Sequence, residues 1–223
     1  MIVAEWKPIQ EICEQLRGHK NVLVAGCATC VAECAAGGER EVEMLAPLLK
    51  MAMQIKGNPI QVYTKTLERQ CEWEFVEELD PLIPKVDAIV SIACGIGIQA
   101  LAARFSQVAV YPGVNTTSLS IREAPGLWEV RCEACGDCML GETYGICPVS
   151  RCAKSLMNGP CGGTRKDGKC EVNEEMDCVW KLIMEKAGEL GRLDDLRKIR
   201  RAKDWSNSRH GGQKRILRED QRP

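Results

Sequence analysis

Cysteine is the residue type in this chain whose number and spacing could support chemistry. The sequence has 14 cysteines but only two histidines, His19 and His210, among its 223 residues. Neither histidine adjoins a cysteine cluster, which disfavours mixed Cys/His zinc fingers, zinc hydrolases with histidine ligands and Ser-His-Asp hydrolases. Thiols stay reduced in the cytoplasm, so clustered cysteines there bind metal or carry out redox chemistry. The chemistry that remains is that of thiolates.

The first cysteine cluster has the spacing C-x2-C-x3-C and consists of Cys27, Cys30 and Cys34. It follows an apolar run that predicts a buried strand, and Cys71 and Cys94 come after the second and third predicted strands. Because the carboxyl ends of parallel strands meet at one edge of a sheet, all five thiols could converge there. Three closely spaced cysteines and one remote cysteine are a usual ligand set for a 4Fe-4S cluster. We expect Cys94 to be the fourth ligand, with Cys71 as the alternative.

Cys94 also opens a glycine-containing turn, CGIGIQA, between a predicted strand and a predicted helix. The form G-x-G-x-x-A is typical of dinucleotide-binding turns. The next strand ends without the Asp or Glu that would bind the ribose hydroxyls, so metal binding is the favoured role for Cys94. Cys13, in contrast, stands alone in a predicted helix, and we expect it to be an ordinary core residue.

The second cluster starts with two consecutive C-x2-C steps, Cys132, Cys135 and Cys138, and reaches a Cys-Pro pair at Cys147. This pattern is similar to the cluster-binding run of bacterial ferredoxins, except that eight residues rather than three precede the Cys-Pro pair. Cys147 could therefore ligate the same cluster, another cluster or zinc. Further thiols bring the total to eight, enough for two four-ligand sites, and structural zinc is the alternative for either site. These are Cys152, Cys161, Cys170 and Cys178.

The elements that must position these cysteines alternate between predicted strands and helices. A short helix with Pro8 near its start opens the chain, and Pro47 should kink or divide a later helix. The alternation predicts an α/β fold, with an open parallel sheet and flanking helices, followed by a small Cys-rich domain. The predicted strands span residues 21–25, 60–64, 87–93 and 107–111, and the predicted helices span residues 38–53, 71–79, 96–103 and 174–190.

Composition divides the chain into three parts. Residues 1–120 form the predicted α/β domain, and residues 121–190 form a Cys-rich domain that metal rather than an apolar core would stabilise. Residues 191–223 form a basic helix and tail: from residue 192 onward there are 11 Lys and Arg against 5 Asp and Glu, a net charge of +6. We expect this tail to dock on a partner, with Trp205 as an anchor.

The chain lacks the signals of membrane insertion. No stretch approaches about 18 consecutive apolar residues, and Glu5 and Lys7 interrupt the start of the chain. We therefore expect a cytoplasmic protein without a membrane segment.

Several segments together resemble the MetV family, the iron-sulfur small subunit of two-subunit methylenetetrahydrofolate reductases, whose domain is also described as a methylenetetrahydrofolate reductase C-terminal domain. The resemblance covers about residues 5–205, and its most specific part is CPxxxCxKxLxNGPCGG. The segments that carry it are GCATCVAEC, AGGEREVEML, TLERQCEWE, SIACGIGIQA, CEACGDCMLGETYGICPVSRCAKSLMNGPCGG, GKCEV and MDCVW.

The resemblance implies an accessory, non-catalytic subunit of an oxidoreductase. It would relay electrons through 4Fe-4S clusters, one in the α/β domain and one or two in the Cys-rich domain, with zinc as an option in one four-cysteine site. Its partner would be a flavin-containing MetF-type TIM-barrel subunit that reduces methylenetetrahydrofolate in one-carbon or reductive acetyl-CoA metabolism. A further electron-donor subunit or ferredoxin, or NAD(P)H, would supply the electrons. The chain has no recognisable flavin or folate pocket, so no flavin of its own is expected.

The rival hypothesis is a zinc-stapled binding module whose basic tail contacts nucleic acid. Residues 1–191 carry a net charge of −7, and the tail from residue 192 has one aromatic residue, Trp205, and so no stacking platform for bases. We therefore expect no nucleic-acid partner. A brown protein with broad absorption near about 400 nm would favour the relay, and a colourless zinc protein would favour the binding module.

Overall fold

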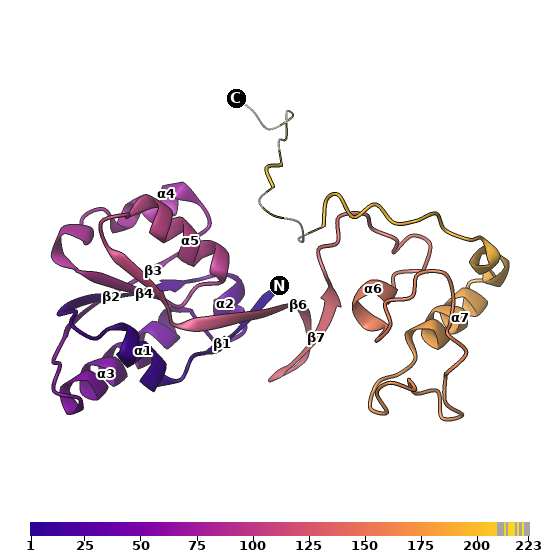
Figure 1. Ribbon diagram of the computed structural model, residues 1–223, viewed down its shortest axis with the longest axis horizontal. Coiled ribbons are helices and arrows are strands. Elements are labelled where there is room, and N and C mark those ends of the chain that lie inside the picture. Colours follow the sequence, from indigo (N-terminus) through magenta and orange to yellow (C-terminus); the bar gives the residue numbers. More distant parts are fainter. Residues whose placement is uncertain (209–211, 213, 217, 219, 221–223) are drawn as a thin grey trace. The chain divides into compact units, whose positions relative to one another are not determined.

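The computed structural model describes residues 1–208, 212, 214–216, 218 and 220. The chain forms two compact units, residues 1–129 and residues 130–223 (Figure 1). His210 and part of the predicted docking tail lie outside the described residues. Among the residues that are described, no helix is long and apolar enough to cross a membrane.

The centre of the first unit is a four-stranded parallel sheet, which confirms the predicted α/β fold. Its strand order is β3-β2-β4-β5. Residues 22–27 of the central strand are all buried because helices cover both faces of the sheet, and this explains the continuous apolar run in the sequence. The strands are β2 (Asn21–Cys27), β3 (Gln61–Leu67), β4 (Ala88–Ser91) and β5 (Ala109–Pro112).

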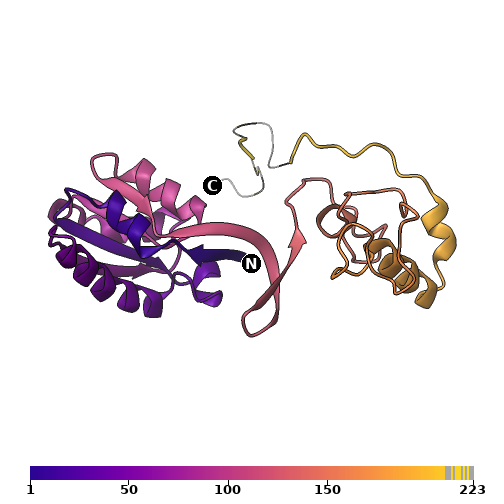
Figure 2. The ribbon, with the colours of Figure 1, turned by 60° about the horizontal axis from the view of Figure 1, so that its bottom comes forward.

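Helices form a layer on each face of this sheet (Figures 1 and 2). Alternate side chains of β2 point to the two layers: Val22 and Val24 pack into one core, and Leu23 and Ala25 pack into the other. The first layer contains α1 (Ile9–Gln15) and α3 (Glu39–Ile55), and the second contains α4 (Trp73–Val76), η1 (Glu77–Leu79), η2 (Ile83–Lys85) and α5 (Gly95–Arg104). The short α2 (Cys30–Glu33) follows β2 directly.

Pro47 does not divide the helix in which it lies. α3 is one element from Glu39 to Ile55, with Pro47 inside it on the exposed face. The carbonyl that loses its hydrogen bond belongs to Glu43, which is also exposed, so water can satisfy it. The helix therefore tolerates the proline better than the sequence suggested.

A second, antiparallel sheet was not predicted from the sequence. It has the order β1-β6-β7, with β1 (Ile2–Trp6), β6 (Val114–Ala124) and β7 (Leu127–Cys132). Because β1 occupies the start of the chain, the opening helix begins only after Pro8. β6 has the polar sequence VNTTSLSIREA, and its strand form depends on pairing with β1, more than 100 residues away in the chain. A local sequence pattern cannot reveal such a pairing.

The second unit has little regular structure. Beyond the end of β7, its described helical elements are α6 (Pro148–Arg151), α7 (Val179–Glu189) and the 3-10 helix η3 (Leu193–Arg197). Its core cluster consists of three buried side chains, Val179, Trp180 and Ile183, with a few partly buried neighbours. α7 starts later than the predicted residue 174, because the residues before it form turns. The predicted tail helix is reduced to η3.

Candidate functional site

The carboxyl edge of the parallel sheet carries Cys27, Cys71 and Cys94. Cys27 ends β2, Cys71 follows β3, and Cys94 follows β4 as the residue that caps α5. The Cys71 residue is exposed, but its sulfur loses part of its hydration, which raises the pKa of this thiol, and the Cys27 and Cys94 thiols raise that pKa further. Cys27 and Cys94 are therefore close enough to Cys71 to act on its thiol, although the three residues come from three separate loops.

A buried glutamine, Gln70, joins these three loops, and the sequence analysis did not single it out. Its side-chain NH2 donates to the carbonyl oxygens of Ala25 at 3.1 Å and Gly26 at 2.8 Å. Its oxygen accepts the Ser91 hydroxyl at 2.7 Å, and the Ser91 oxygen accepts the Ala93 N–H at 3.2 Å. A lone glutamine before a cysteine gives no sequence signal, because its partners become neighbours only when the sheet forms.

The other two cysteines of the first cluster lie at the ends of α2. Cys30 begins α2 and is half-buried, whereas Cys34 follows α2 and is buried. The Cys34 sulfur accepts the Ala4 N–H of β1 at 3.5 Å. Ala4 pairs with Thr116 of β6, and the Thr116 hydroxyl accepts the Gly95 N–H at 2.9 Å. The unpredicted sheet thus connects the Cys34 environment to the loop of Cys94.

Four cysteines of the second unit line one small cavity. Its volume is about 20 Å³, which is room for about one water-sized atom. Two of the sulfurs accept hydrogen bonds: Cys178 from the Thr164 hydroxyl at 3.0 Å and Cys161 from the Gly163 N–H at 3.4 Å. The cysteines are Cys152, Cys161, Cys170 and Cys178.

A charged pair adjoins this cavity. Lys154 donates to Glu171, and this hydrogen bond raises the pKa of Lys154 and lowers the pKa of Glu171. The Cys161 sulfur lies 3.3 Å from a Glu171 oxygen. A cation beside a thiolate group offsets part of its negative charge. A local sequence pattern could not predict this pair, because 17 residues separate the two partners.

The loop that carries the two C-x2-C steps lies at the end of β7. Cys132 and Cys138 are exposed, whereas Cys135 is half-buried. Cys135 and Cys152 share the lining of a cavity of about 350 Å³, together with Trp205. Cys147 caps the short helix α6. The structure therefore brings one cysteine from each half of the second cluster to a common cavity.

Residues 198–208, here called the C-terminal strap, contact this cysteine loop. The Arg200 guanidinium lies 2.6 Å from the Asp137 carboxylate and, through this hydrogen bond, lowers the pKa of Asp137. The fully buried Lys203 side chain donates to the Asp137 carbonyl, and its amine lies 5.2 Å from the Trp205 ring centroid. A Cβ added at Gly136 would lie 2.6 Å from Asn207. Part of the tail that was predicted to dock on a partner therefore packs against its own unit.

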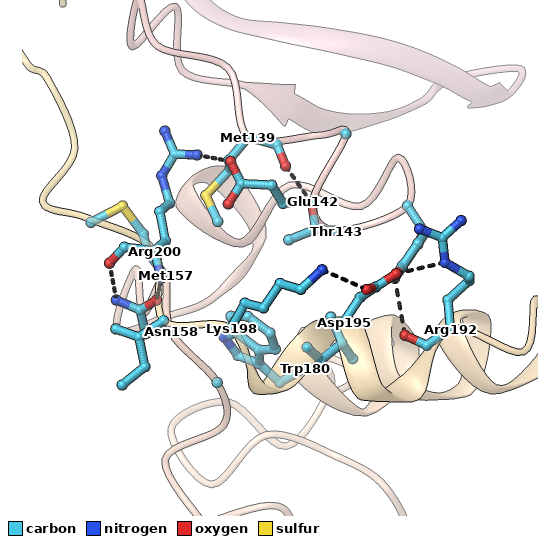
Figure 3. A pocket seen from close by; sticks show the side chains of 15 residues that line it. Met139, Glu142, Thr143, Met157, Asn158, Trp180, Arg192, Asp195, Lys198 and Arg200 are labelled. Carbon is cyan, nitrogen blue, oxygen red and sulfur yellow. Dashed lines mark hydrogen bonds and ion pairs between the residues drawn. The ribbon is translucent and has the colours of Figure 1, made fainter.

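The start of the strap borders a cavity of about 310 Å³ (Figure 3). Lys198 and Arg192 both point at Asp195, and their hydrogen bonds lower the pKa of Asp195 to about 2. Arg200 donates to Glu142, and its backbone exchanges two hydrogen bonds with the Asn158 side chain, at 2.7 and 3.2 Å. These charged side chains are already paired with one another rather than free to bind a ligand. The cavity therefore marks the surface on which the strap packs.

Cys13 packs in the core of the first unit, as expected, and burial raises the pKa of its thiol. Across the described residues, no three or more His, Cys, Asp or Glu side chains are already arranged to hold a metal ion. The donors in each unit nevertheless suit a soft metal, because they are free thiols gathered at the sheet edge and around one small cavity.

Residues 111–206 match the protein family described as Methylene-tetrahydrofolate reductase C terminal, a match that covers 96 of the 223 residues. It begins within β5 and includes every cysteine from Cys132 to Cys178. No curated protein and no solved structure matches the chain. The second unit and the strands that precede it are thus similar to the C-terminal region of methylene-tetrahydrofolate reductases.

Proposed function

We propose that this protein is an electron-relay subunit that passes electrons through iron-sulfur clusters to a flavin-containing methylenetetrahydrofolate reductase subunit. The similarity of residues 111–206 supports the link to that reductase. The observation that carries the redox role is the meeting of Cys27, Cys71 and Cys94 at one sheet edge, with Cys30 and Cys34 on the helix beside it. Cys27 packs in the apolar core and Cys94 packs against it, but Cys71 is exposed, so core packing does not account for a thiol at the end of three successive strands. A metal site at this edge would account for it.

In this proposal the sheet-edge cysteines hold a 4Fe-4S cluster, with ligands drawn from Cys27, Cys30, Cys34 and either Cys94 or Cys71. Such a cluster supplies a carrier that accepts and releases one electron. The chain itself orients the sulfurs and provides N–H donors to them, as Ala4 does to Cys34. Hydrogen bonds to ligand sulfurs stabilise the reduced, more negative state and so raise the reduction potential.

The second unit would hold two four-thiol sites. The cavity among Cys152, Cys161, Cys170 and Cys178 has room for one atom, which favours a single zinc ion there. The loop with Cys132, Cys135 and Cys138, together with Cys147, would hold a second 4Fe-4S cluster. Zinc alone in every site is the second candidate, which would make the protein a structural binding module.

Metal and sulfide analysis of the anaerobically purified full chain tests the proposed function. The wild-type protein should contain iron, acid-labile sulfide and zinc, and its reduced form should give a 4Fe-4S electron paramagnetic resonance signal. Cys27→Ser should remove about four iron atoms, because serine replaces a soft thiolate poorly. Cys13→Ser is the matched control and should keep all the iron, since Cys13 is buried in the same unit but lies beside Met53 and Lys56 at the carboxyl end of α3.

Two results would overturn this assignment. A colourless wild-type protein that contains only zinc would favour the binding module. Equal iron contents in Cys27→Ser and Cys13→Ser would show that the sheet edge is not an iron site. The partner role has its own test, because reduced wild-type protein mixed with a flavin-containing reductase subunit should bleach the flavin absorbance.

A further inference from the structure

The Gln70 side chain is hydrogen-bonded to the residues that precede the cysteine-bearing loops. Gln70 directly precedes Cys71, and it bonds to Gly26, which directly precedes Cys27. Through Ser91 it also reaches Ala93, which directly precedes Cys94. One side chain thus ties together the residues that come immediately before Cys27 and before both candidates for the fourth ligand, Cys71 and Cys94.

The hydrogen bonds among Gln70, β2 and Ser91 require an amide side chain of the length of glutamine. Gln70 is fully buried, and both its amide nitrogen and its amide oxygen are hydrogen-bonded. A glutamate would face two carbonyl oxygens with a carboxylate, which has no N–H to donate. A leucine would fill a similar volume but make none of the bonds, and the buried Ser91 hydroxyl would lose its acceptor. The residue type is therefore set by the partners on β2 and β4.

The turn after Cys94 is shaped to fit this glutamine. A Cβ added at Gly97 would lie 2.7 Å from the Gln70 Cβ and 2.9 Å from the Ala93 Cβ. Contacts this short force a neighbour to move, so glycine at this position leaves space for Gln70. Packing against Gln70 thus accounts for the second glycine of CGIGIQA without a bound dinucleotide.

We propose that Gln70 is a positioning residue that fixes the spacing of Cys27, Cys71 and Cys94 before a cluster binds. The inference rests on the proposed function, since it takes the sheet edge as the cluster site. A metal centre is held best when its ligands are prearranged by hydrogen bonds behind them. Without the Gln70 bonds the three loops can separate, and the cluster is then held less firmly and in a changed hydrogen-bonding environment.

The test compares Gln70→Leu and Gly97→Ala with the wild-type full chain. Gly97→Ala crowds the Gln70 side chain but leaves the Gln70 amide in the protein. This variant therefore tests the proposal even if Gln70→Leu folds poorly. Gln99→Leu is the matched control: Gln99 also lies near Cys94, but it is exposed, and its amide donates to the Gly95 carbonyl within α5. The measurements are the rate of cluster loss to a chelator, the reduction potential of the edge cluster and the circular dichroism of the metal-free proteins.

Both test variants should lose the edge cluster about 10-fold faster than the wild type, with a shifted potential and unchanged circular dichroism. The control should match the wild type. If Gln70→Leu and Gly97→Ala keep the wild-type rate and potential, Gln70 does not position the ligands, and the proposed function still stands. If the wild type has no cluster at this edge, the proposed function fails and the inference fails with it.

Discussion

Replacing Lys203 with methionine should loosen the cysteine loop of the second unit. The Lys203 amine donates to the Asp137 carbonyl and lies 3.9 Å from the Asp137 carboxylate and 5.2 Å from the Trp205 ring centroid. Its side chain has 0% exposure, so these contacts form away from water. Methionine keeps most of the apolar stem but removes the charge and the donor.

The expected loss follows from these contacts. A hydrogen bond from a charged group contributes about 1.5 to 3 kcal/mol, and a cation–π contact contributes about 0.5 kcal/mol or more. The lower ends of both ranges sum to about 2 kcal/mol, which multiplies the constant for local opening by about 30. Asp137 keeps Arg200 as a partner, so its carboxylate is not left alone. The second unit should therefore open locally rather than unfold.

Hydrogen exchange followed by mass spectrometry measures this opening. In Lys203→Met, peptides that cover residues 132–139 and 199–208 should exchange about 30-fold faster, while peptides of β2 should not change. Lys198→Met is the control, because that side chain is 80% exposed and solvent screens its ion pair with Asp195. The reasoning is refuted if Lys203→Met accelerates exchange by less than about threefold, or by no more than Lys198→Met does.

Two further predictions concern acid and metal. The Asp195 carboxyl should titrate near pH 2 by nuclear magnetic resonance, because its folded pKa of about 2 lies below the ordinary 3.8. Its ion pairs therefore contribute to stability above pH 3.8 and lose that contribution as the pH falls through about 2, and a midpoint at 3.8 would contradict this. Strong chelation should expose residues 130–208 to protease before residues 1–129, because the core cluster of the second unit has three buried side chains. Equal protection of both units after metal removal would argue against a metal-dependent fold.

Much of the first unit was predictable because its signals are local. Apolar runs buried on both faces and helical spacing gave the four parallel strands and the helices between them. Because parallel strands end at one edge of a sheet, the sequence alone predicted that Cys27, Cys71 and Cys94 lie in the same region. For the second unit, the change in composition after residue 120 indicated a segment with little apolar core.

Other features exist only in the folded chain, because they join residues that are far apart in sequence. β1 and β6 pair over more than 100 residues, and neither carries a pattern strong enough to predict the sheet. The sequence assigns Lys203 and Trp205 to a basic tail that is expected to dock on a partner, whereas the fold packs them against the loop of Asp137 and Cys135. Gln70 has no feature in the sequence that sets it apart from the other glutamines. Only the folded sheet brings Ala25, Gly26 and Ser91 within hydrogen-bonding distance of it. Residue types and spacing thus predict thiolate chemistry, whereas the tertiary structure decides which side chains surround the thiols. Hydrogen bonds and packing depend on distance in space rather than on distance along the chain.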